Sequence, residues 1–369
     1  MSDAKPLYLQ IYDDLKILIK NQTYQAGDLL PTETELCKTY ETSRPTIAKA
    51  VKLLSDEHLV YRKAGFGTQV LAEDKPAATI ALLIPQLHET EIFMPICQSI
   101  AEAAASEGMN IIRRSEFDPN HDVQAFAESL TEQFIDLKVN GVFFTPVEFI
   151  PQPRDFNLKI IERLTDHGIS VVLLDRDVHD WPSQTPYDLV GIDNIEAGFV
   201  VTEHLIGNGC RDLAFISESD PAMTVHLRRI GVREAMIQNG LRARDLVNIH
   251  LDPKHPEKAA AEILSTETTG IVCANDTTAA TLLRALLDLG ADIPGALQVC
   301  GFDDVKYASL LSVPLTSYRQ PCNDIGKIAI NTMIARIKYP DAPAQRITLK
   351  GELVVRESAS GPLRSADAG

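Results

Sequence analysis

The sequence predicts an α/β protein of two parts: a small N-terminal helix-turn-helix domain with a β-hairpin wing, and a larger domain of two doubly wound, parallel α/β lobes. The first part follows from residues 30–70, where two short helical patterns joined by a polar turn precede a glycine-tipped hairpin. The second follows from residue 79 onward, where short apolar runs alternate with helical periodicity in two successive blocks. With 369 residues, the chain is long enough to bury a core in each part.

The N-terminal region carries three predicted helices. Residues 6–21 form an amphipathic pattern with one apolar face. Thr32, followed three residues later by Glu35, is a capping box that begins a second, short helix. Pro45 stands in the first turn of a third helix, where its missing N–H does no harm. Four apolar side chains share one face of that helix: Ile47, Ala50, Val51 and Leu54. This third helix is basic near its start, which is the arrangement that fits a major groove of DNA.

A β-hairpin is predicted after the third helix, over residues 59–63 and 64–70. Gly65 and Gly67 permit the left-handed dihedral angles of its turn. The chain has a net charge of −16, yet segment 43–70 holds five Lys or Arg residues against two Asp or Glu residues. Because charges beyond ~8 Å are largely screened at physiological salt, DNA affinity depends on this local excess of positive charge. The acidic remainder therefore does not exclude a DNA-binding segment.

Residues 72–78 break the pattern and predict a linker between a domain at 1–71 and a domain at 79–369. In the second domain the sequence predicts strands at 79–84, 110–113, 141–144, 170–174, 189–191, 213–216, 270–273 and 298–301. It predicts helices at 96–107, 123–137, 158–167, 195–208, 228–239, 256–264 and 278–289. Alternation of this kind places a ligand cleft at the carboxyl ends of the strands.

Several polar side chains follow those strands directly. Asp175 follows one apolar run, Asn275 another and Asp303 a third, while Gln320 lies in a later segment and Arg228 begins a predicted helix. Carboxylate, amide and guanidinium groups that converge on one cleft suit a polyhydroxylated ligand, because each hydroxyl both donates and accepts. The alternative is that such residues cap the following helix or join the lobes, above all the neighbouring Asp276 and Asp304.

The N-terminal region resembles the winged helix-turn-helix of GntR-family transcription regulators. The matching residues are Leu30-Pro31-Thr32-Glu33, Leu36, Ser43-Arg44, Thr46-Ile47, Ala50, Leu59-Val60, Gly65 and Gly67-Thr68. The chain departs from the family at Ala48, where an arginine is usual, and at His58, where a glycine is usual. The resemblance implies DNA contacts by Thr32, Glu33, Ser43, Arg44, Thr46, Lys49, Lys63, Gly65, Phe66 and Gly67.

From Ile80 to Ser358 the chain is similar to the effector domain of LacI-type repressors, which share the fold of periplasmic sugar-binding proteins. The similarity rests on Leu174-Asp175-Arg176, Ile192-Asp193-Asn194, Arg228 with Gly231, Ala274-Asn275-Asp276, Gly301-Phe302-Asp303-Asp304 and Glu352-Leu353-Val354-Val355-Arg356-Glu357-Ser358. It implies effector contacts by Phe93, Ser115, Asp175, Arg228, Asn275, Asp303 and Gln320. The family often stacks an aromatic side chain on the sugar, but residues 251–258 hold none; Phe93, Phe117 and Trp181 are the candidate substitutes.

Together these resemblances imply a homodimeric transcriptional regulator, most simply a repressor, that binds a pseudo-palindromic operator and responds to a small polar effector, preferably a sugar. A nucleoside or another metabolite is the alternative effector. An enzyme fused to a DNA-binding head is a weaker alternative, since the body has no phosphate-binding glycine loop. The six cysteines lack metal-site spacing, and no apolar run approaches a membrane span, so we expect a cytoplasmic protein without metal or cofactor.

Overall fold

The computed structural model of the chain describes residues 5–21, 23–57, 59–63, 66–71, 77–85, 87, 91–113, 122–219 and 221–363. Two compact units make up the chain, Met1–Ala77 and Ala78–Gly369. The predicted linker lies at their junction, and all of it except residues 77 and 78 falls outside the described ranges. Among the described residues, no helix combines the length and the apolar character needed to cross a lipid bilayer.

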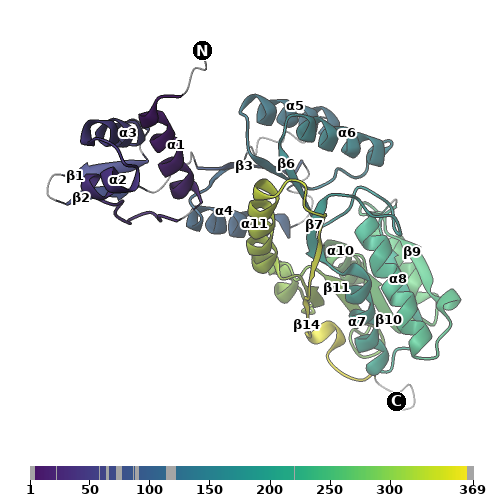
Figure 1. The fold of residues 1–369 in the computed structure, drawn as a ribbon. Helices are drawn as coiled ribbons and strands as arrows, with labels where there is room; N and C mark the ends of the chain where they lie inside the picture. Colours follow the sequence, from purple (N-terminus) through teal and green to yellow (C-terminus); the bar gives the residue numbers. More distant parts are fainter. Residues whose placement is uncertain are drawn as a thin grey trace. The chain divides into compact units, whose positions relative to one another are not determined.

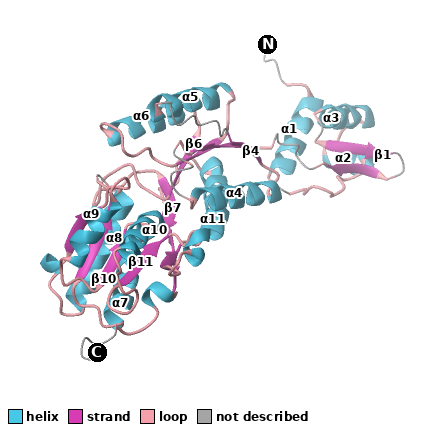
Figure 2. Cartoon of the chain, turned by 180° about the vertical axis from the view of Figure 1, so that it is seen from behind, coloured by secondary structure: helices cyan, strands magenta, loops and turns pink. Residues whose placement is uncertain are grey.

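The first unit is a three-helix domain with a hairpin, as predicted (Figures 1 and 2). Its elements are α1 (Leu7–Lys20), α2 (Glu33–Thr39), α3 (Arg44–Asp56), β1 (Val60–Lys63) and β2 (Gly67–Val70). The strands pair antiparallel, with Val60 opposite Val70. The predicted apolar face of α3 is fully buried, because it packs with Ile11, Leu15 and Leu36 from the other two helices. The capping box at Thr32 and Glu35 is confirmed.

The second unit holds two six-stranded sheets, one in each lobe. The first sheet has the order β13-β7-β6-β5-β3-β4, and every pairing in it is parallel. Its strands are β3 (Thr79–Leu83), β4 (Asn110–Arg113), β5 (Gly141–Phe144), β6 (Ser170–Leu174), β7 (Asp188–Ile192) and β13 (Arg346–Leu349). One face packs on α5 (Val123–Asp136) and α6 (Pro153–Asp166), and the other on α4 (Phe93–Ser106) and α11 (Cys322–Lys338) (Figure 1).

The second sheet has the order β14-β12-β11-β10-β8-β9 and is parallel except for the edge strand β14. Its strands are β8 (Leu213–Ser217), β9 (Val247–His250), β10 (Gly270–Cys273), β11 (Gln298–Phe302), β12 (Thr316–Arg319) and β14 (Glu352–Val354). One face packs on α7 (Asn194–Gly207) and α8 (Met223–Gln238), and the other on α9 (Pro256–Leu264) and α10 (Asp276–Asp288). The two-lobed parallel α/β prediction is confirmed.

The structure differs from the sequence prediction in several elements. Periodicity did not predict helix α11 or strands β9, β12, β13 and β14. Helices α4, α6 and α8 each begin three to five residues earlier than predicted. Arg228 therefore does not begin α8; it lies in the second turn, because Met223 and the following residues already continue the helix. The omission of α11 has no local cause, since Ile325, Ala329 and Met333 are buried at helical spacing.

The chain passes between the two sheets at residues 192–194, 319–322 and 349–352. These crossings come at strand ends, so the carboxyl ends of both sheets face the region where the lobes meet. Figure 2 shows β7 between the helices of the two lobes. This arrangement positions the strand-end side chains described below.

Helices α7 and α8 cross so closely that only glycine fits at the contact. A Cβ atom on Gly231 would lie 2.0 Å from the Ile195 carbonyl oxygen, and one on Gly198 would lie 2.0 Å from the Arg228 carbonyl oxygen. Because both obstacles are backbone atoms, they cannot move aside without separating the helices.

We expect Gly231→Ala to destabilise the second unit by about 1–3 kcal/mol, through overpacking of this contact. Urea unfolding followed by circular dichroism of the full chain measures the change. Gly207→Ala is the matched control, because nothing lies within 4 Å of a Cβ there, so its midpoint should equal or exceed the wild type. Equal midpoints for both variants would contradict the close-packing argument.

Candidate DNA-binding surface and effector cleft

The exposed start of α3 carries the polar residues predicted to contact DNA. Arg44 is the first residue of the helix, and its side chain is 74% exposed. Ser43 precedes it as the N-cap, and its hydroxyl lies 2.9 Å from the Thr46 hydroxyl. The N-cap makes no side-chain bond to the helix backbone, so its hydroxyl pairs with a side chain instead. Arg44 and Ser43 thus lie on the solvent side of the buried α3 stripe.

Glu33 joins the two arginines of this surface. Its Oε2 accepts a 2.9 Å hydrogen bond from Arg44 Nε, and its Oε1 pairs with Arg62 on the wing strand β1. The bond to Glu33 raises the pKa of the Arg44 guanidinium above its ordinary value, so Arg44 stays fully charged. Glu33 therefore links α2 to the start of α3 and to the wing strand β1 through these two arginines.

The other residues of the DNA-binding prediction have varied surroundings. Thr32 uses its side chain in the capping box of α2, accepting a bond from Glu35 N. Lys49 Nζ lies 3.9 Å from the centre of the Tyr8 ring, so this lysine rests on α1. Phe66 is 56% exposed, and Gly67 has a φ of +114° that favours glycine. The Lys63 side chain and Gly65 lie outside the described residues.

A cavity of about 430 Å³ lies between the lobes of the second unit, at the carboxyl ends of the strands. Five of the seven predicted effector residues line it: Phe93, Asp175, Arg228, Asn275 and Asp303. Gln320 lies behind them, with its Nε2 donating to Asp303 Oδ1 over 2.8 Å. Ser115 falls outside the described residues. The rule that ligands bind at the carboxyl ends of parallel strands, here called the strand-end rule, therefore correctly placed residues up to 210 positions apart around one cavity.

Arg228 is the fixed cation of this cleft. Its side chain is 5% exposed, and three protein groups hold it. Nε donates to Asn194 Oδ1 over 2.9 Å, Nη1 donates to the Ala274 carbonyl over 2.6 Å, and Nη2 lies 3.4 Å from Asp303 Oδ1. The guanidinium also lies over the Phe302 ring, 4.6 Å from its centre. The planar fork is preorganised before any ligand arrives.

Two carboxylates end their strands in strained conformations. Asp175 has a φ of +68° and Asp303 a φ of +100°, both in the region that side chains rarely adopt. Burial raises the pKa of Asp175 to about 7, because lost solvation outweighs the attraction of Arg228, and Asp303 raises it further. Arg176 Nε donates to Asp175 Oδ2 over 3.0 Å, a hydrogen bond that favours the charged form.

The neighbouring acids serve the fold, as the alternative interpretation of the sequence allowed. Asp276 accepts from Ser317 Oγ over 2.7 Å and from Val305 N over 3.0 Å, joining α10 to the segments around β11 and β12. Burial raises the pKa of Asp276 to about 8. Asp304 pairs with Arg319 and Arg356, each at 2.6 Å. Asn275 both lines the cleft and caps α10, accepting from Thr278 N over 2.8 Å.

Sequence reasoning missed several cleft residues, among them Glu148 and Phe149. Both lie in the loop after β5, where the same strand-end rule could have found them. Glu148 pairs with Arg176 in its own lobe and accepts from Met223 N of the other lobe over 3.2 Å. Phe149 is 61% exposed with a φ of +61°, a strained backbone that presents an apolar ring to solvent.

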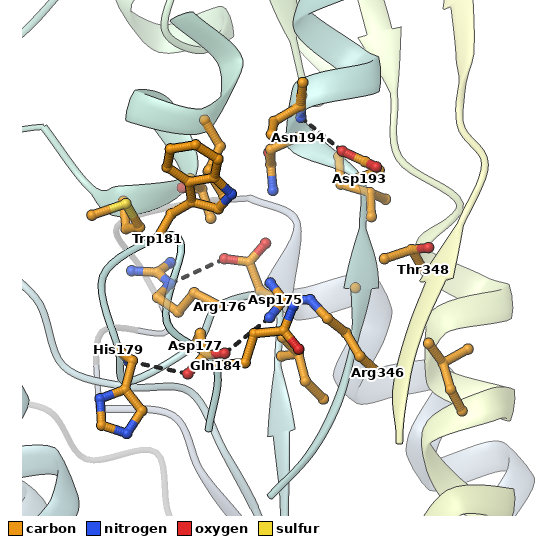
Figure 3. A pocket seen from close by; sticks show the side chains of 18 of the residues that line it. Asp175, Arg176, Asp177, His179, Trp181, Gln184, Asp193, Asn194, Arg346 and Thr348 are labelled. Carbon is orange, nitrogen blue, oxygen red and sulfur yellow. Dashed lines mark hydrogen bonds and ion pairs between the residues drawn. The ribbon is translucent and has the colours of Figure 1, made fainter. Parts of the chain in front are cut away.

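Two described aromatic residues line the cleft, Phe93, which the sequence predicted, and Phe149, which it did not. Phe93 lines the cleft but is 1% exposed, and the Arg176 guanidinium lies 5.6 Å from its ring centre. Trp181 lines a different pocket (Figure 3), and Phe117 lies outside the described residues. Within the described ranges, no group of three or more His, Cys, Asp or Glu side chains is arranged to hold a metal ion.

Comparison with known families finds a match in each of the two units. Residues 7–70 match the gntR family of bacterial regulatory proteins, and residues 202–359 match the periplasmic binding protein-like domain. The Arabinose metabolism transcriptional repressor of Geobacillus stearothermophilus is 26% identical over 366 residues, 96% of this chain and 97% of that protein. The transcriptional regulator MalR of Streptomyces coelicolor is 28% identical over 305 residues, 81% of this chain and 86% of that protein.

Solved structures show the same fold. A LacI family regulator from Enterococcus faecalis with bound ribose aligns with a TM-score of 0.63 at 25% identity, covering 78% of this chain and 100% of that one. The regulator CelR in complex with cellobiose aligns with a TM-score of 0.62 at 23% identity, covering 86% and 92%. These similarities confirm the resemblance that the sequence motifs indicated for each domain.

Proposed function

We propose that this chain, a transcriptional regulator that joins a GntR-type DNA-binding domain to a periplasmic-binding-protein-like effector domain, changes its operator affinity when a neutral sugar occupies its cleft. The observation that carries the proposal is the fixed set of Arg228, Asp175 and Asp303 around one cavity. Guanidinium donors and carboxylate acceptors at set positions pair with sugar hydroxyls in one stereochemistry. The exposed Phe149 ring supplies the apolar face on which a sugar ring stacks.

Charge in the cleft favours a neutral ligand over a phosphorylated one. Among the described residues that line the cavity are four acids, Glu148, Asp175, Glu218 and Asp303, and two arginines, Arg176 and Arg228. Arg176 already pairs with Asp175 and Glu148, and Arg228 lies beside Asp303. An added phosphate would meet an excess of negative charge, which costs free energy in a poorly solvated site. The ribose and cellobiose in the similar structures are neutral sugars, in agreement with this choice.

We infer repression as the mode of action, because several relatives are named as repressors. In this proposal a homodimer presents two copies of α3 to a pseudo-palindromic operator. Closure of the lobes on the sugar acts through the linker at 72–78 and changes the spacing of the two DNA-binding domains in the dimer. The changed spacing releases the DNA. A coupling of this kind is typically worth ~1–3 kcal/mol.

A thermal-shift screen of neutral pentoses, hexoses and disaccharides, with sugar phosphates and nucleosides beside them, tests the proposal. A true effector at a hundredfold excess over its Kd stabilises the protein by about 2.7 kcal/mol. The sugar that shifts the midpoint should then release a double-stranded DNA selected from a random library for binding to this protein. Stabilisation by nucleosides alone would overturn the sugar assignment, and tighter DNA binding with the sugar would overturn the direction.

The pH dependence of sugar binding should follow Asp175. A hydroxyl that donates to this carboxylate favours its ionised form, so affinity is expected to rise with pH up to about 7 and then level off. Below that, affinity falls by up to about tenfold per pH unit, because the carboxyl group must first lose its proton. The stability of the unliganded protein changes in the opposite direction. Because the pKa of Asp175 is raised in the folded state, its ionisation lowers the free energy of unfolding as the pH rises towards 7.

Calorimetric titration of the effector at several values between about pH 5 and about pH 8 measures this profile. Asp175→Asn is the matched variant, since its amide keeps the shape and cannot ionise. Its affinity should be lower and nearly independent of pH. A wild-type profile as flat as that of the variant would show that no ligand hydroxyl donates to Asp175.

A further inference from the structure

A second, smaller pocket lies beside the effector cleft, next to the segments where the chain crosses between the lobes. We call it the hinge pocket; its volume is about 170 Å³. Its lining comes from the loop after β6, the start of α7, the first turns of α8 and strand β13. Residues 192–194 are a crossing segment, and β13 leads directly into another. Space of this size holds on the order of ten waters, comparable to one monosaccharide with its hydroxyls.

Trp181 forms one side of the hinge pocket. The indole is 53% exposed and makes no hydrogen bond, ion pair or ring contact with another described residue. In Figure 3 it lies across the pocket from Thr348 and Arg346, with Asp175 and Arg176 between them. An exposed tryptophan in a concave polar setting is a stacking surface for the apolar face of a sugar ring.

Polar groups with unused hydrogen-bonding capacity surround that ring. The side chains of Gln184, Ser183 and Thr348 line the pocket and form no hydrogen bond with the rest of the described chain. Asp193 uses Oδ1 to cap α7 at Ile195 N and Glu196 N, which leaves Oδ2 as an acceptor. Amide, hydroxyl and carboxylate groups together can donate to and accept from several ligand hydroxyls.

Apart from Asp193, which caps α7, the Asp and Arg residues that line the pocket are already paired, which argues for a neutral ligand. Arg346 Nη1 donates to Asp177 over 2.9 Å, and Arg176 Nε donates to Asp175 over 3.0 Å. An anion or a cation would have to disrupt one of these pairs, whereas a neutral polyol need not.

The hinge pocket and the cleft share a wall. Asp175, Arg176 and Thr224 line both cavities, and the other residues that line the hinge pocket do not line the cleft. Asn194, which lines the hinge pocket, accepts the 2.9 Å bond from Arg228 Nε, and Arg228 lines the cleft. A ligand in either cavity therefore lies against Asp175, Arg176 and Thr224.

From this geometry we propose that the hinge pocket is a second binding site, specific for a neutral monosaccharide that stacks on Trp181. The site touches both lobes, at β13 and the loop after β6 on one side and at α8 on the other. Occupancy of the hinge pocket depends on how the lobes are arranged. By linkage, a ligand in the hinge pocket changes the affinity of the cleft for its ligand by the same factor by which the cleft ligand changes the affinity of the hinge pocket. The regulator then responds to the concentrations of two sugars, one in each site.

Trp181 is the single tryptophan of the chain, so its fluorescence reports directly on this pocket. The probes are D-glucose, D-xylose, L-arabinose and D-ribose, each titrated into the full-length protein with fluorescence and calorimetry in parallel. We expect one of them to alter the indole emission with saturation. The double variant Gln184→Ala/Thr348→Val changes only exposed side chains, so it should fold normally and weaken this event by tenfold or more.

Phe149→Ala is the matched cleft variant. It should leave the fluorescence titration of the hinge pocket within about twofold of wild type, because Phe149 lines the cleft and not the hinge pocket. The proposal is overturned if no probe changes the emission, or if the change survives the double variant and disappears in Phe149→Ala. If the change survives the double variant and disappears in Phe149→Ala, the indole reports on ligand binding in the cleft. The proposed effector site then remains, and the proposed hinge-pocket site does not.

Discussion

An Arg44→Ala variant is expected to lose about 30-fold or more in operator affinity while keeping its fold. A side chain that reads a base edge contributes about 1–3 kcal/mol, and a dimer presents the residue twice. Arg44 stands at the exposed start of α3, and Glu33 orients its guanidinium. The structural cost is small, since the side chain is 74% exposed and Glu33 keeps its pairing with Arg62.

Fluorescence anisotropy with a selected operator duplex measures the loss, and circular dichroism checks the fold. Lys20→Ala is the matched control, because it removes the same charge from an exposed position at the end of α1. A loss that is equal in both variants would mean that Arg44 contributes only general positive charge. Glu33→Gln should fall between the two, since it weakens the bond that orients Arg44 without removing the guanidinium.

Local signals were sufficient to predict the DNA-binding domain. The capping box at Thr32 and Glu35, the early Pro45 and the spacing of Ile47 and Leu54 each describe contacts within a few residues. Such contacts are set by backbone geometry, so periodicity and capping rules find them. The pairing of Glu33 with two arginines depends on how α2, α3 and β1 pack, and periodicity does not encode it.

The cleft was predictable to the extent that topology alone places residues. Asp175, Asn275 and Asp303 end parallel strands, and such ends meet at one edge. The same rule applied to β5 would have added Phe149. The rule does not predict which side chains form hydrogen bonds with one another. Arg228 is held by Asn194, Ala274 and Asp303, residues between 34 and 75 positions away. Nor does it give the raised pKa of Asp175, which follows from burial and not from neighbours in sequence.

Replacement of Arg228 by alanine should give a regulator that still binds its operator but no longer responds to the sugar. Charge-assisted hydrogen bonds contribute about 1.5–3 kcal/mol each, so losing two of them lowers effector affinity by roughly a hundredfold or more. The change also leaves Asp303 without its buried cation and removes the attraction that opposes desolvation of Asp175. Breaking a buried pair in this way costs about 3–5 kcal/mol of stability.

Because the lost stability could itself abolish the response, two further variants separate the causes. Arg229→Ala removes the same charge from the next position of α8, outside the cleft, and should respond normally. Arg228→Lys keeps the charge beside Asp303 but lacks the planar fork that reaches Asn194 and Ala274 together. If the lysine variant is stable, binds operator and yet needs far more sugar for release, then the fork geometry is what recognises the ligand. If it responds like the wild type, Arg228 serves only to balance buried charge, and specificity must come from Asp175, Asn275 and Phe149 instead.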